Sequence, residues 1–202
     1  MKPDNGRLDG VRAAASLVLL AAATAASLLA GGPRPSARQV TPARAIPAGA
    51  FASVIEASSF AYCCIEHEGG LADIQMAIQA LMLETQSQNI YPSGPIMVVY
   101  DSDPNLVDPD AIVWEVGFPV TPQVMPQAPL FKKVWYYTSV ARAYHFGAYY
   151  EIDKTIERLM AWIDDNGYTA AGPILERYLD LAPDVPASAG LRTEIWVPVG
   201  RR

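Results

Sequence analysis

The amino-acid sequence repeats itself at an offset of 78 residues, and this duplication limits the possible folds more than any other feature. His67 recurs as His145, and Gly94-Pro95-Ile96 recurs as Gly172-Pro173-Ile174. One extra residue in the last loop of the second copy raises the offset to 79, at which Glu115 recurs as Glu194 and Pro119-Val120 recur as Pro198-Val199. Chance rarely preserves glycines and histidines in one order, so we expect two copies of one structural unit.

Each copy has the pattern of one helix among three strands. In the first copy, apolar residues between Leu71 and Thr85 recur at the spacing of a helix face, and the second copy keeps these positions between Tyr149 and Ile163. A strand-like run precedes each helix and two more follow it, with Asp-Pro turn signals between them in the first copy. We therefore predict an α+β fold.

The two copies also define the expected domain. We predict tandem βαββ modules, repeat one at residues 60–120 and repeat two at residues 131–199, within a domain that spans 60–200. A pseudo-two-fold axis would relate the modules, and each helix would cover its own strands. The seam between the modules is therefore where we expect a ligand cleft.

The N-terminal part of the chain looks different from this domain. An uncharged apolar stretch, Ala13 to Ala30, follows a segment with two arginines, which is typical of a secretory signal. A stretch of this length can also span a bilayer as an anchor. We predict that residues 1–32 are a signal peptide or N-terminal anchor, and that 33–59 are a linker with one short element around Phe51 to Ile55. Either interpretation of the apolar stretch places the protein outside the cytoplasm, in the periplasm or beyond.

Charge and motif content exclude several classes of function. The formal charge of −6 argues against a nucleic-acid partner. The only cysteines are the neighbours Cys63 and Cys64, and their spacing does not suit a metal site. No glycine-rich phosphate loop and no Gly-x-Ser-x-Gly nucleophile motif is present. We expect a monomer without a metal or cofactor.

In the order and spacing of its motifs, the chain resembles the gyrase-inhibitor-like (GyrI-like), AraC-type effector-binding domain family. The motifs that carry this resemblance are Gly94-Pro95, Val113 to Val120, His145 to Tyr149, Trp162 to Tyr168, Gly172-Pro173, Glu176-Arg177-Tyr178 and Thr193 to Val199. The resemblance implies two βαββ modules that bind a small, often lipophilic and cationic molecule between them. It also implies that Glu194, in the final TEIW-x-PV segment, faces the pocket. No helix-turn-helix segment precedes the domain, which argues against direct gene regulation.

Acidic and aromatic side chains are the candidates for ligand binding. Glu194 alternates with Trp196 on one face of the last expected strand, where a carboxylate among apolar residues needs a cationic partner. That partner is either a bound cation or an internal arginine, Arg192 or Arg177. The full set of candidate ligand-binding residues is Glu194, Trp196, Tyr178, Glu176, Tyr100, Trp114, Glu115, Tyr137 and Tyr149.

Each of these residues also has a purely structural interpretation. Aromatic rings attract organic cations through their faces, yet any one ring is as well explained by core packing. Glu115 is the repeat counterpart of Glu194, so it lies either near the same cleft or in solvent beside a turn. The paired histidines are explained by the duplication without a metal.

Three functions remain open from the sequence. The first is binding of a hydrophobic, cationic small molecule without a DNA-binding domain. The second is a hydrolase that opens strained or electrophilic rings, with Glu194 or Glu115 as the acid or base. The third is a protein-interaction module, which the expected export makes the weakest of the three.

Overall fold

The structure is a computed structural model that describes residues 51–70, 74–180 and 190–202. The expected signal or anchor, and the expected linker as far as residue 50, lie outside these described residues. Within the described part of the chain, no helix combines the length and the apolar character that crossing a membrane requires.

The described chain alternates strands with two α-helices and two short 3-10 turns. The strands are β1 (Ala52–Glu56), β2 (Phe60–Glu68), β3 (Met97–Tyr100), β4 (Val113–Pro119), β5 (Phe131–Trp135), β6 (Ser139–Phe146), β7 (Tyr168–Ala170), β8 (Ile174–Tyr178) and β9 (Arg192–Arg201). The α-helices are α2 (Ile74–Ser87) and α3 (Ile152–Asp165), and the 3-10 turns are η3 (Pro109–Ala111) and η4 (Tyr149–Glu151). We call β2 to β4 with α2 the first half, and β6 to β9 with α3 the second half.

One antiparallel sheet joins the two halves. Its order is β1-β6-β9-β8-β3-β4-β2-β5, and β7 pairs with β9 beside this path. The halves meet where β3 pairs with β8, with Val98 opposite Glu176 at the centre of the register. The prediction of a mixed α+β fold is thus confirmed as a large antiparallel sheet with two helices.

β1 precedes the first half in the chain but extends the second half. β5 precedes the second half but extends the first. β1 pairs with β6, and β5 pairs with β2. β1 falls inside the range 33–59 that we expected to be linker, at the place where the sequence suggested a short element. Residues 52–56 of this range form an edge strand of the sheet.

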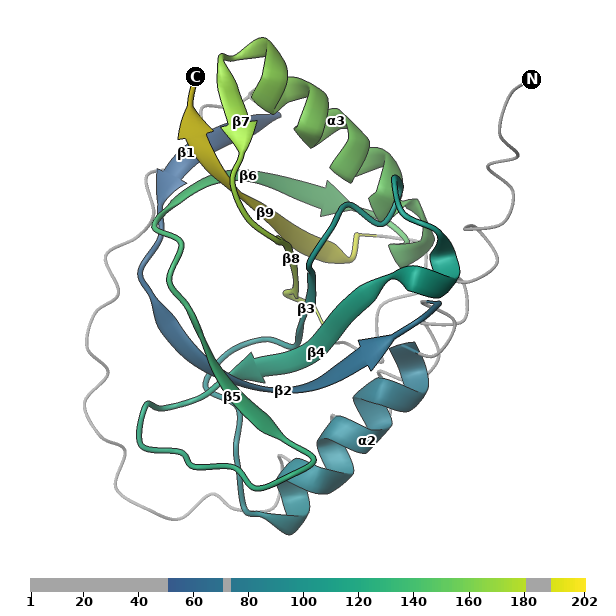
Figure 1. The fold of residues 1–202 in the computed structure, drawn as a ribbon, viewed down its shortest axis with the longest axis vertical. Coiled ribbons are helices and arrows are strands. Elements are labelled where there is room, and N and C mark those ends of the chain that lie inside the picture. The colour runs from purple at the N-terminus through teal and green to yellow at the C-terminus, as the bar shows by residue number, and fades with distance from the viewer. Residues whose placement is uncertain (1–50, 71–73, 181–189) are drawn as a thin grey trace.

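Both helices cover the same face of the sheet, which we call the outer face (Figure 1). α2 packs on β2 and β4, and α3 packs on β6, β7 and β9. Buried residues of α3 follow helical spacing at Ile152, Ile156, Leu159 and Ile163. The resulting core is continuous from one helix to the other across the outer face.

The opposite face, which we call the inner face, is buried by the curvature of the sheet itself. Trp135 on β5 and Trp196 on β9 are separated by five strand spacings, a path of about 24 Å along the sheet. Their ring centroids are nevertheless only 6.4 Å apart. The sheet therefore curls until its inner face encloses a second core, around Tyr62, Met97 and Leu175.

Close approach of β4 to β2 leaves no room for a side chain at Gly117. A Cβ atom there would lie 2.3 Å from the carbonyl oxygen of Cys63, which is rigid backbone. We expect Gly117→Ala to lower the free energy of unfolding by about 3 kcal/mol, because the paired strands must move apart. Urea unfolding of the full-length chain measures this loss.

Gly200→Ala is the matched control on β9. Its added Cβ would meet only a side-chain atom at 3.9 Å, which is an ordinary contact. We expect a change of less than about 0.5 kcal/mol. Equal effects of the two substitutions would contradict the tight packing of β4 on β2.

Candidate functional site

Two buried carboxylates lie on the inner face, one in each half of the sheet. Glu115 on β4 is 6% exposed, and Glu194 on β9 is 4% exposed. Side chains alternate between the two faces of a strand, so the same pleat that sends Trp114 and Ile195 to the outer core sends these carboxylates inward. Buried carboxylates require partners, and each has its own set.

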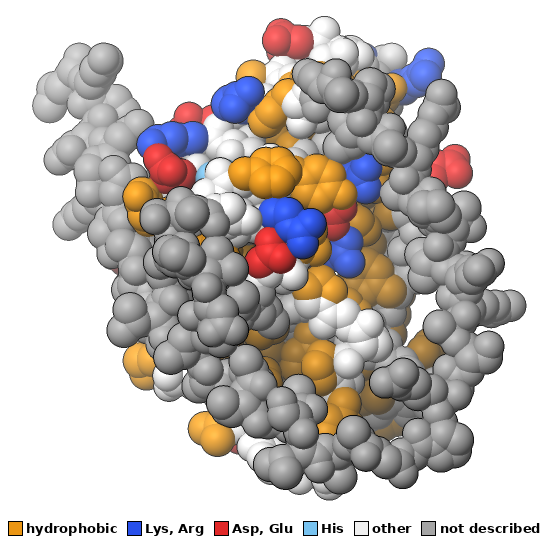
Figure 2. Space-filling view, turned by 180° about the vertical axis from the view of Figure 1, so that it is seen from behind, with side chains coloured by type: hydrophobic (Ala, Val, Ile, Leu, Met, Phe, Trp, Pro, Cys, Tyr) orange, Lys and Arg blue, Asp and Glu red, His pale blue; other side chains and the backbone are white. Residues whose placement is uncertain are grey.

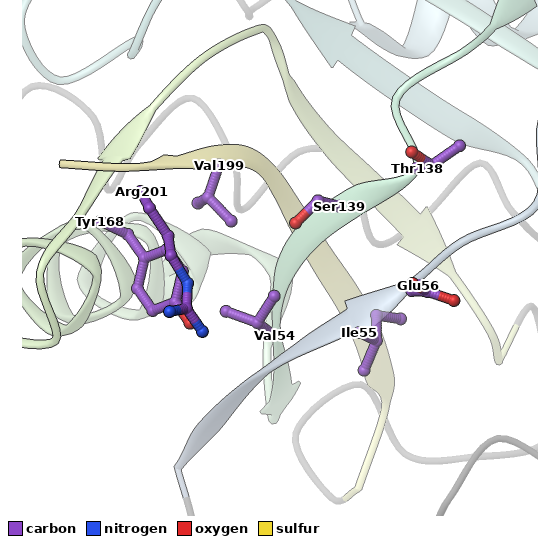
Figure 3. A pocket seen from close by; sticks show the side chains of 8 residues that line it. All are labelled: Val54, Ile55, Glu56, Thr138, Ser139, Tyr168, Val199 and Arg201. Carbon is purple, nitrogen blue, oxygen red and sulfur yellow. The ribbon is translucent and has the colours of Figure 1, made fainter.

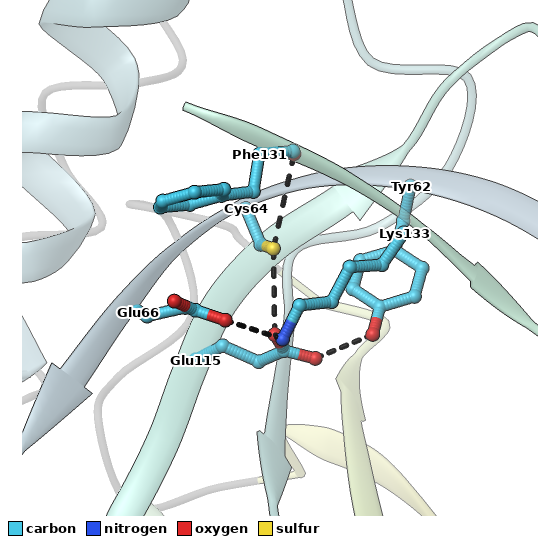
Figure 4. A network of polar contacts seen from close by, with 6 residues as sticks. All are labelled: Tyr62, Cys64, Glu66, Glu115, Phe131 and Lys133. Atoms are coloured by element: carbon cyan, nitrogen blue, oxygen red, sulfur yellow. Dashed lines mark hydrogen bonds and ion pairs between the residues drawn. The ribbon is translucent and has the colours of Figure 1, made fainter. Parts of the chain in front are cut away.

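The partners of Glu115 come from β2 and β5 (Figure 4). The Tyr62 hydroxyl donates a short hydrogen bond to one carboxylate oxygen, and the Cys64 thiol donates to the other at 3.4 Å. Lys133 Nζ lies 2.6 Å from Glu115 and also 2.6 Å from the half-exposed Glu66. Two carboxylates therefore share one ammonium group at this end of the face.

This arrangement fixes the protonation of the groups around Glu115. Burial raises the pKa of the Tyr62 hydroxyl and of the Cys64 thiol, and the negative charge of Glu115 raises each pKa further. Burial acts to lower the pKa of Lys133, but hydrogen bonds to Glu115 and Glu66 outweigh it and raise that pKa. At neutral pH the cluster holds a neutral tyrosine, a neutral thiol and a charged lysine.

The partners of Glu194 are two arginines and a tyrosine. Arg177 Nη1 lies 2.5 Å from one carboxylate oxygen, and Arg142 Nη1 lies 3.4 Å from the other. The Tyr144 hydroxyl donates to the same carboxylate at 3.1 Å, and burial together with the Glu194 charge raises the pKa of this tyrosine. Of the two internal partners that the sequence suggested, Arg177 is present, whereas Arg192 binds Asp180 at 2.8 Å.

Arg177 also lies over the ring of Trp196, with its guanidinium carbon 4.6 Å from the ring centroid. The aromatic surface that we expected to receive a ligand cation at Glu194 is thus in contact with a cation of the protein. Arg142, Arg177 and Glu194 together carry a net positive charge.

The nine candidates divide between the two faces. Glu115, Glu194 and Trp196 lie on the inner face, and Tyr137 packs against its core. Tyr100, Trp114, Tyr149, Glu176 and Tyr178 lie on the outer face, beneath or between the helices. The structure therefore does not gather all nine at one place.

The outer-face group has local structural partners. The Trp114 indole donates to the carbonyl of Gly69 at 3.0 Å, and the Tyr178 hydroxyl donates to Glu176 at 2.7 Å. Tyr149 packs edge-on against Tyr178, with centroids 5.1 Å apart. Burial raises the pKa of Tyr149 to about 12, so this hydroxyl stays protonated at neutral pH.

The second-half histidine of the sequence repeat is also held internally. The imidazole nitrogens of His145 contact the Thr155 hydroxyl at 2.9 Å and the Ala148 carbonyl at 3.0 Å. Across residues 51–70, 74–180 and 190–202, no group of three or more His, Cys, Asp or Glu side chains is arranged to hold a metal ion.

Several inner-face residues were not among the candidates from the sequence. They are Tyr62, Cys64, Lys133, Trp135, Arg142 and Arg177. The alternation of side chains along a strand could have identified three of them. Tyr62 and Cys64 share one face of β2 with Glu66, which pairs with Glu115. Arg142 shares one face of β6 with Tyr144, which pairs with Glu194. Lys133 and Trp135 could not be found in this way, since their place depends on the long-range pairing of β5 with β2.

A surface hollow of about 270 Å³ lies elsewhere, at the β1 edge of the sheet (Figure 3). Its lining includes Val54, Ser139, Tyr168 and Arg201, and none of the nine candidates. In the face drawn in Figure 2, basic and acidic side chains lie beside one another among hydrophobic ones. The inner face, with its two carboxylates and aromatic core, is the better candidate site.

The fold is an α+β domain whose curled antiparallel sheet buries two carboxylates on its inner face. The family model of the GyrI-like small molecule binding domain matches residues 52–200. The chain belongs to this family.

Solved structures share the fold at low sequence identity. The EcmrR C-terminal domain aligns with a TM-score of 0.67 at 18% identity, over 75% of this chain and 98% of that one. A hydrolase encoded by lin2189 from Listeria innocua aligns with a TM-score of 0.53 at 14% identity, over 74% and 91%. SAV2435, in a structure bound to tetraphenylphosphonium, aligns with a TM-score of 0.50 at 13% identity, over 74% and 93%. No curated protein sequence matches the chain.

The hydrogen bond from Tyr62 to Glu115 yields a stability prediction. We expect Tyr62→Phe to lower the free energy of unfolding at pH 7 by about 1.5 to 3 kcal/mol, because a buried carboxylate loses a donor. The folded-state pKa of Tyr62 is raised above its unfolded value of about 10, so its contribution is present below that pH and declines above it. The difference between wild type and variant should therefore narrow above about pH 10.

Urea unfolding at pH 7 and at higher pH measures both effects. Tyr136→Phe is the control, since Tyr136 is 66% exposed, and we expect it to change stability by less than about 0.5 kcal/mol. A Tyr62→Phe protein as stable as wild type at pH 7 would contradict the buried hydrogen bond.

Proposed function

We propose that the protein binds a hydrophobic, aromatic organic cation on the inner face of its sheet, with the cationic group beside Glu115. The observation that carries this proposal is the buried Glu115 carboxylate, which shares the ammonium group of Lys133 with Glu66. The proposal keeps the ligand class expected from the sequence and places its charge at the first-half glutamate.

The charges of the two clusters favour Glu115 over Glu194 as the cation site. Glu115, Glu66 and Lys133 carry a net charge of −1, whereas Glu194, Arg142 and Arg177 carry +1. Interactions between charges are strongest where water is excluded, so this difference matters most for buried groups. A cation at Glu194 would have to displace Arg177, but one at Glu115 need only loosen the half-exposed Lys133.

A row of aromatic side chains begins at Tyr62, beside Glu115, and continues across the inner face. Tyr62 donates to Glu115 itself, and Phe60 lies 6.2 Å from Tyr62 and 6.4 Å from Trp135, measured between ring centroids. Trp135 in turn packs edge-on against Tyr137 at 5.0 Å. Such rings bind flat hydrophobic ligands and attract organic cations to their faces.

The relation between the halves supports a site at their seam. At the offset of 78, Val98 corresponds to Glu176, and these two residues face each other where β3 meets β8. At the same offset Met97 corresponds to Leu175, and Val99 corresponds to Arg177. The cross-strand pair of Met97 and Arg177 is therefore equivalent to the pair of Leu175 and Val99. We propose that the halves are two βαββ modules related by a pseudo-two-fold axis through this pair.

Two further considerations agree with the proposal. The family is one of small-molecule binding, and SAV2435 is described with bound tetraphenylphosphonium. The apolar segment Ala13 to Ala30 supports the proposal that the protein is exported and meets its ligand outside the cytoplasm.

Titration with tetraphenylphosphonium tests the cation site. We expect saturable quenching of tryptophan fluorescence in the full-length chain, and an affinity at least tenfold lower, about 1.4 kcal/mol, in Glu115→Gln. Glu157→Gln is the control, because it removes the same charge from an exposed position of α3, and its affinity should stay within twofold of wild type. If both variants lost the same affinity for tetraphenylphosphonium, the loss would be explained by the net charge of the protein. Glu115 would then not be part of the binding site.

A hydrolase is the second candidate function, favoured by the Glu115 network. The Glu115 carboxylate, held by a hydrogen bond from Tyr62, can take a proton from water as the water oxygen forms a bond to a ring carbon; the strained ring bond breaks, and the proton passes from Glu115 to the leaving atom. We expect hydrolysis of a strained cyclopropane electrophile to fall at least a hundredfold in Glu115→Gln, as followed by chromatography of the product. Turnover no faster than with heat-denatured protein would eliminate this candidate.

A further inference from the structure

Three buried hydrogen-bond donors on the inner face lack an acceptor among the residues that the structure describes. They are the Nε atoms of Arg142 and Arg177 and the indole Nε1 of Trp196. Arg142 is 5% exposed and Trp196 is 7% exposed, so bulk water does not replace the missing acceptors. Buried donors without acceptors are uncommon in folded proteins and call for a specific explanation.

These donors belong to one cluster. Arg142 is the cross-strand partner of Trp196 on β6 and β9, and Arg177 on β8 lies over the Trp196 ring. Both guanidinium groups bind the same Glu194 carboxylate. Three adjacent strands thus direct two cations and an indole to one part of the inner face.

The cluster has more donor capacity than its own acceptor can use. Glu194 supplies a single carboxylate, which already accepts from Arg142, Arg177 and Tyr144. One positive charge remains uncompensated within the cluster. A group that supplied acceptor oxygens and negative charge would satisfy both deficits, because guanidinium binds carboxylates and similar oxyanions through several N–H groups.

We propose that the cluster of Arg142, Arg177 and Trp196 is a subsite for an anionic oxygen group, a carboxylate or sulfonate, on the bound molecule. This inference rests on the proposed function, because it describes the other end of the same ligand. Glu115 and Glu194 are three strand spacings apart, about 14 Å along the sheet and less across its curvature. The preferred ligand is therefore a zwitterionic aromatic molecule, with its cationic group toward Glu115 and its oxyanion toward the arginines.

Rhodamine B and its ethyl ester form a matched pair of probes for this subsite. The two dyes share the same aromatic cation, and only rhodamine B has a free carboxylate. We expect the full-length wild-type chain to bind rhodamine B at least tenfold more tightly than the ester, measured by fluorescence anisotropy. In Arg177→Gln this preference should fall below threefold, while the affinity for the ester stays within twofold of wild type.

Variants separate the subsite from the rest of the face. Arg177→Gln keeps Arg142 and Glu194 as a balanced ion pair, which protects the fold from an unpaired buried charge. Trp196→Phe keeps every charge and the ring but removes one donor, and it should reduce the preference two- to fivefold. Glu115→Gln should weaken both dyes equally and leave the preference unchanged.

The outcomes distinguish this inference from the proposed function. If wild type binds both dyes with equal affinity, the oxyanion subsite is wrong and the cation site stands. If wild type binds neither dye nor tetraphenylphosphonium, the proposed function itself fails. A preference for rhodamine B that survives both Arg177→Gln and Trp196→Phe would place the carboxylate elsewhere.

Discussion

The contact between Trp135 and Trp196 is the constraint on which the candidate site depends. It joins strands that are far apart in the sheet order, and so it makes one face of the sheet the lining of an enclosed core. Enclosure removes water from Glu115 and Glu194, and a buried carboxylate is tolerated only with partners. The lysine, arginines and tyrosines that gather around the two glutamates are therefore a consequence of the curvature. Binding chemistry in this protein follows from how strongly its sheet bends.

Glu115 and Glu194 occupy corresponding positions of the sequence repeat, but their surroundings differ. The position of Cys64 in the first half corresponds to Arg142 in the second, and that of Val99 corresponds to Arg177. With these two arginines the Glu194 cluster has a net charge of +1, whereas the Glu115 cluster with Glu66 and Lys133 has −1. The two charged clusters of the inner face are therefore opposite in sign. The proposed ligand, with unlike charges at its two ends, would bind between these clusters in one orientation.

The sequence predicted the fold class and the helices well, because the duplication and the apolar stripe are local signals. Helix α3 ends at Asp165, directly before Asn166-Gly167, a residue pair that favours the end of a helix. The sequence did not show which residues lie on which face of the sheet. Both faces of this sheet are buried, so Tyr100 and Glu176 look no different in pattern from Trp196 and Glu194. The roles of Lys133 and β1 could not be predicted either, because each depends on a strand pairing between segments distant in the chain.

The reciprocal placement of β1 and β5 ties the halves together more firmly than a simple tandem arrangement would. Ala52 pairs with Ala143 and Ala61 with Val134, so each half is completed at its edge by a strand that precedes the other half's first strand. Under this arrangement each half takes an edge strand from a segment that lies outside it in the chain. A chain of half the length would leave one edge open and one strand unpaired, and it would be complete only as a dimer that exchanges strands. In evolutionary terms, fusion of two such copies would convert a concentration-dependent assembly into a fold that one chain completes alone.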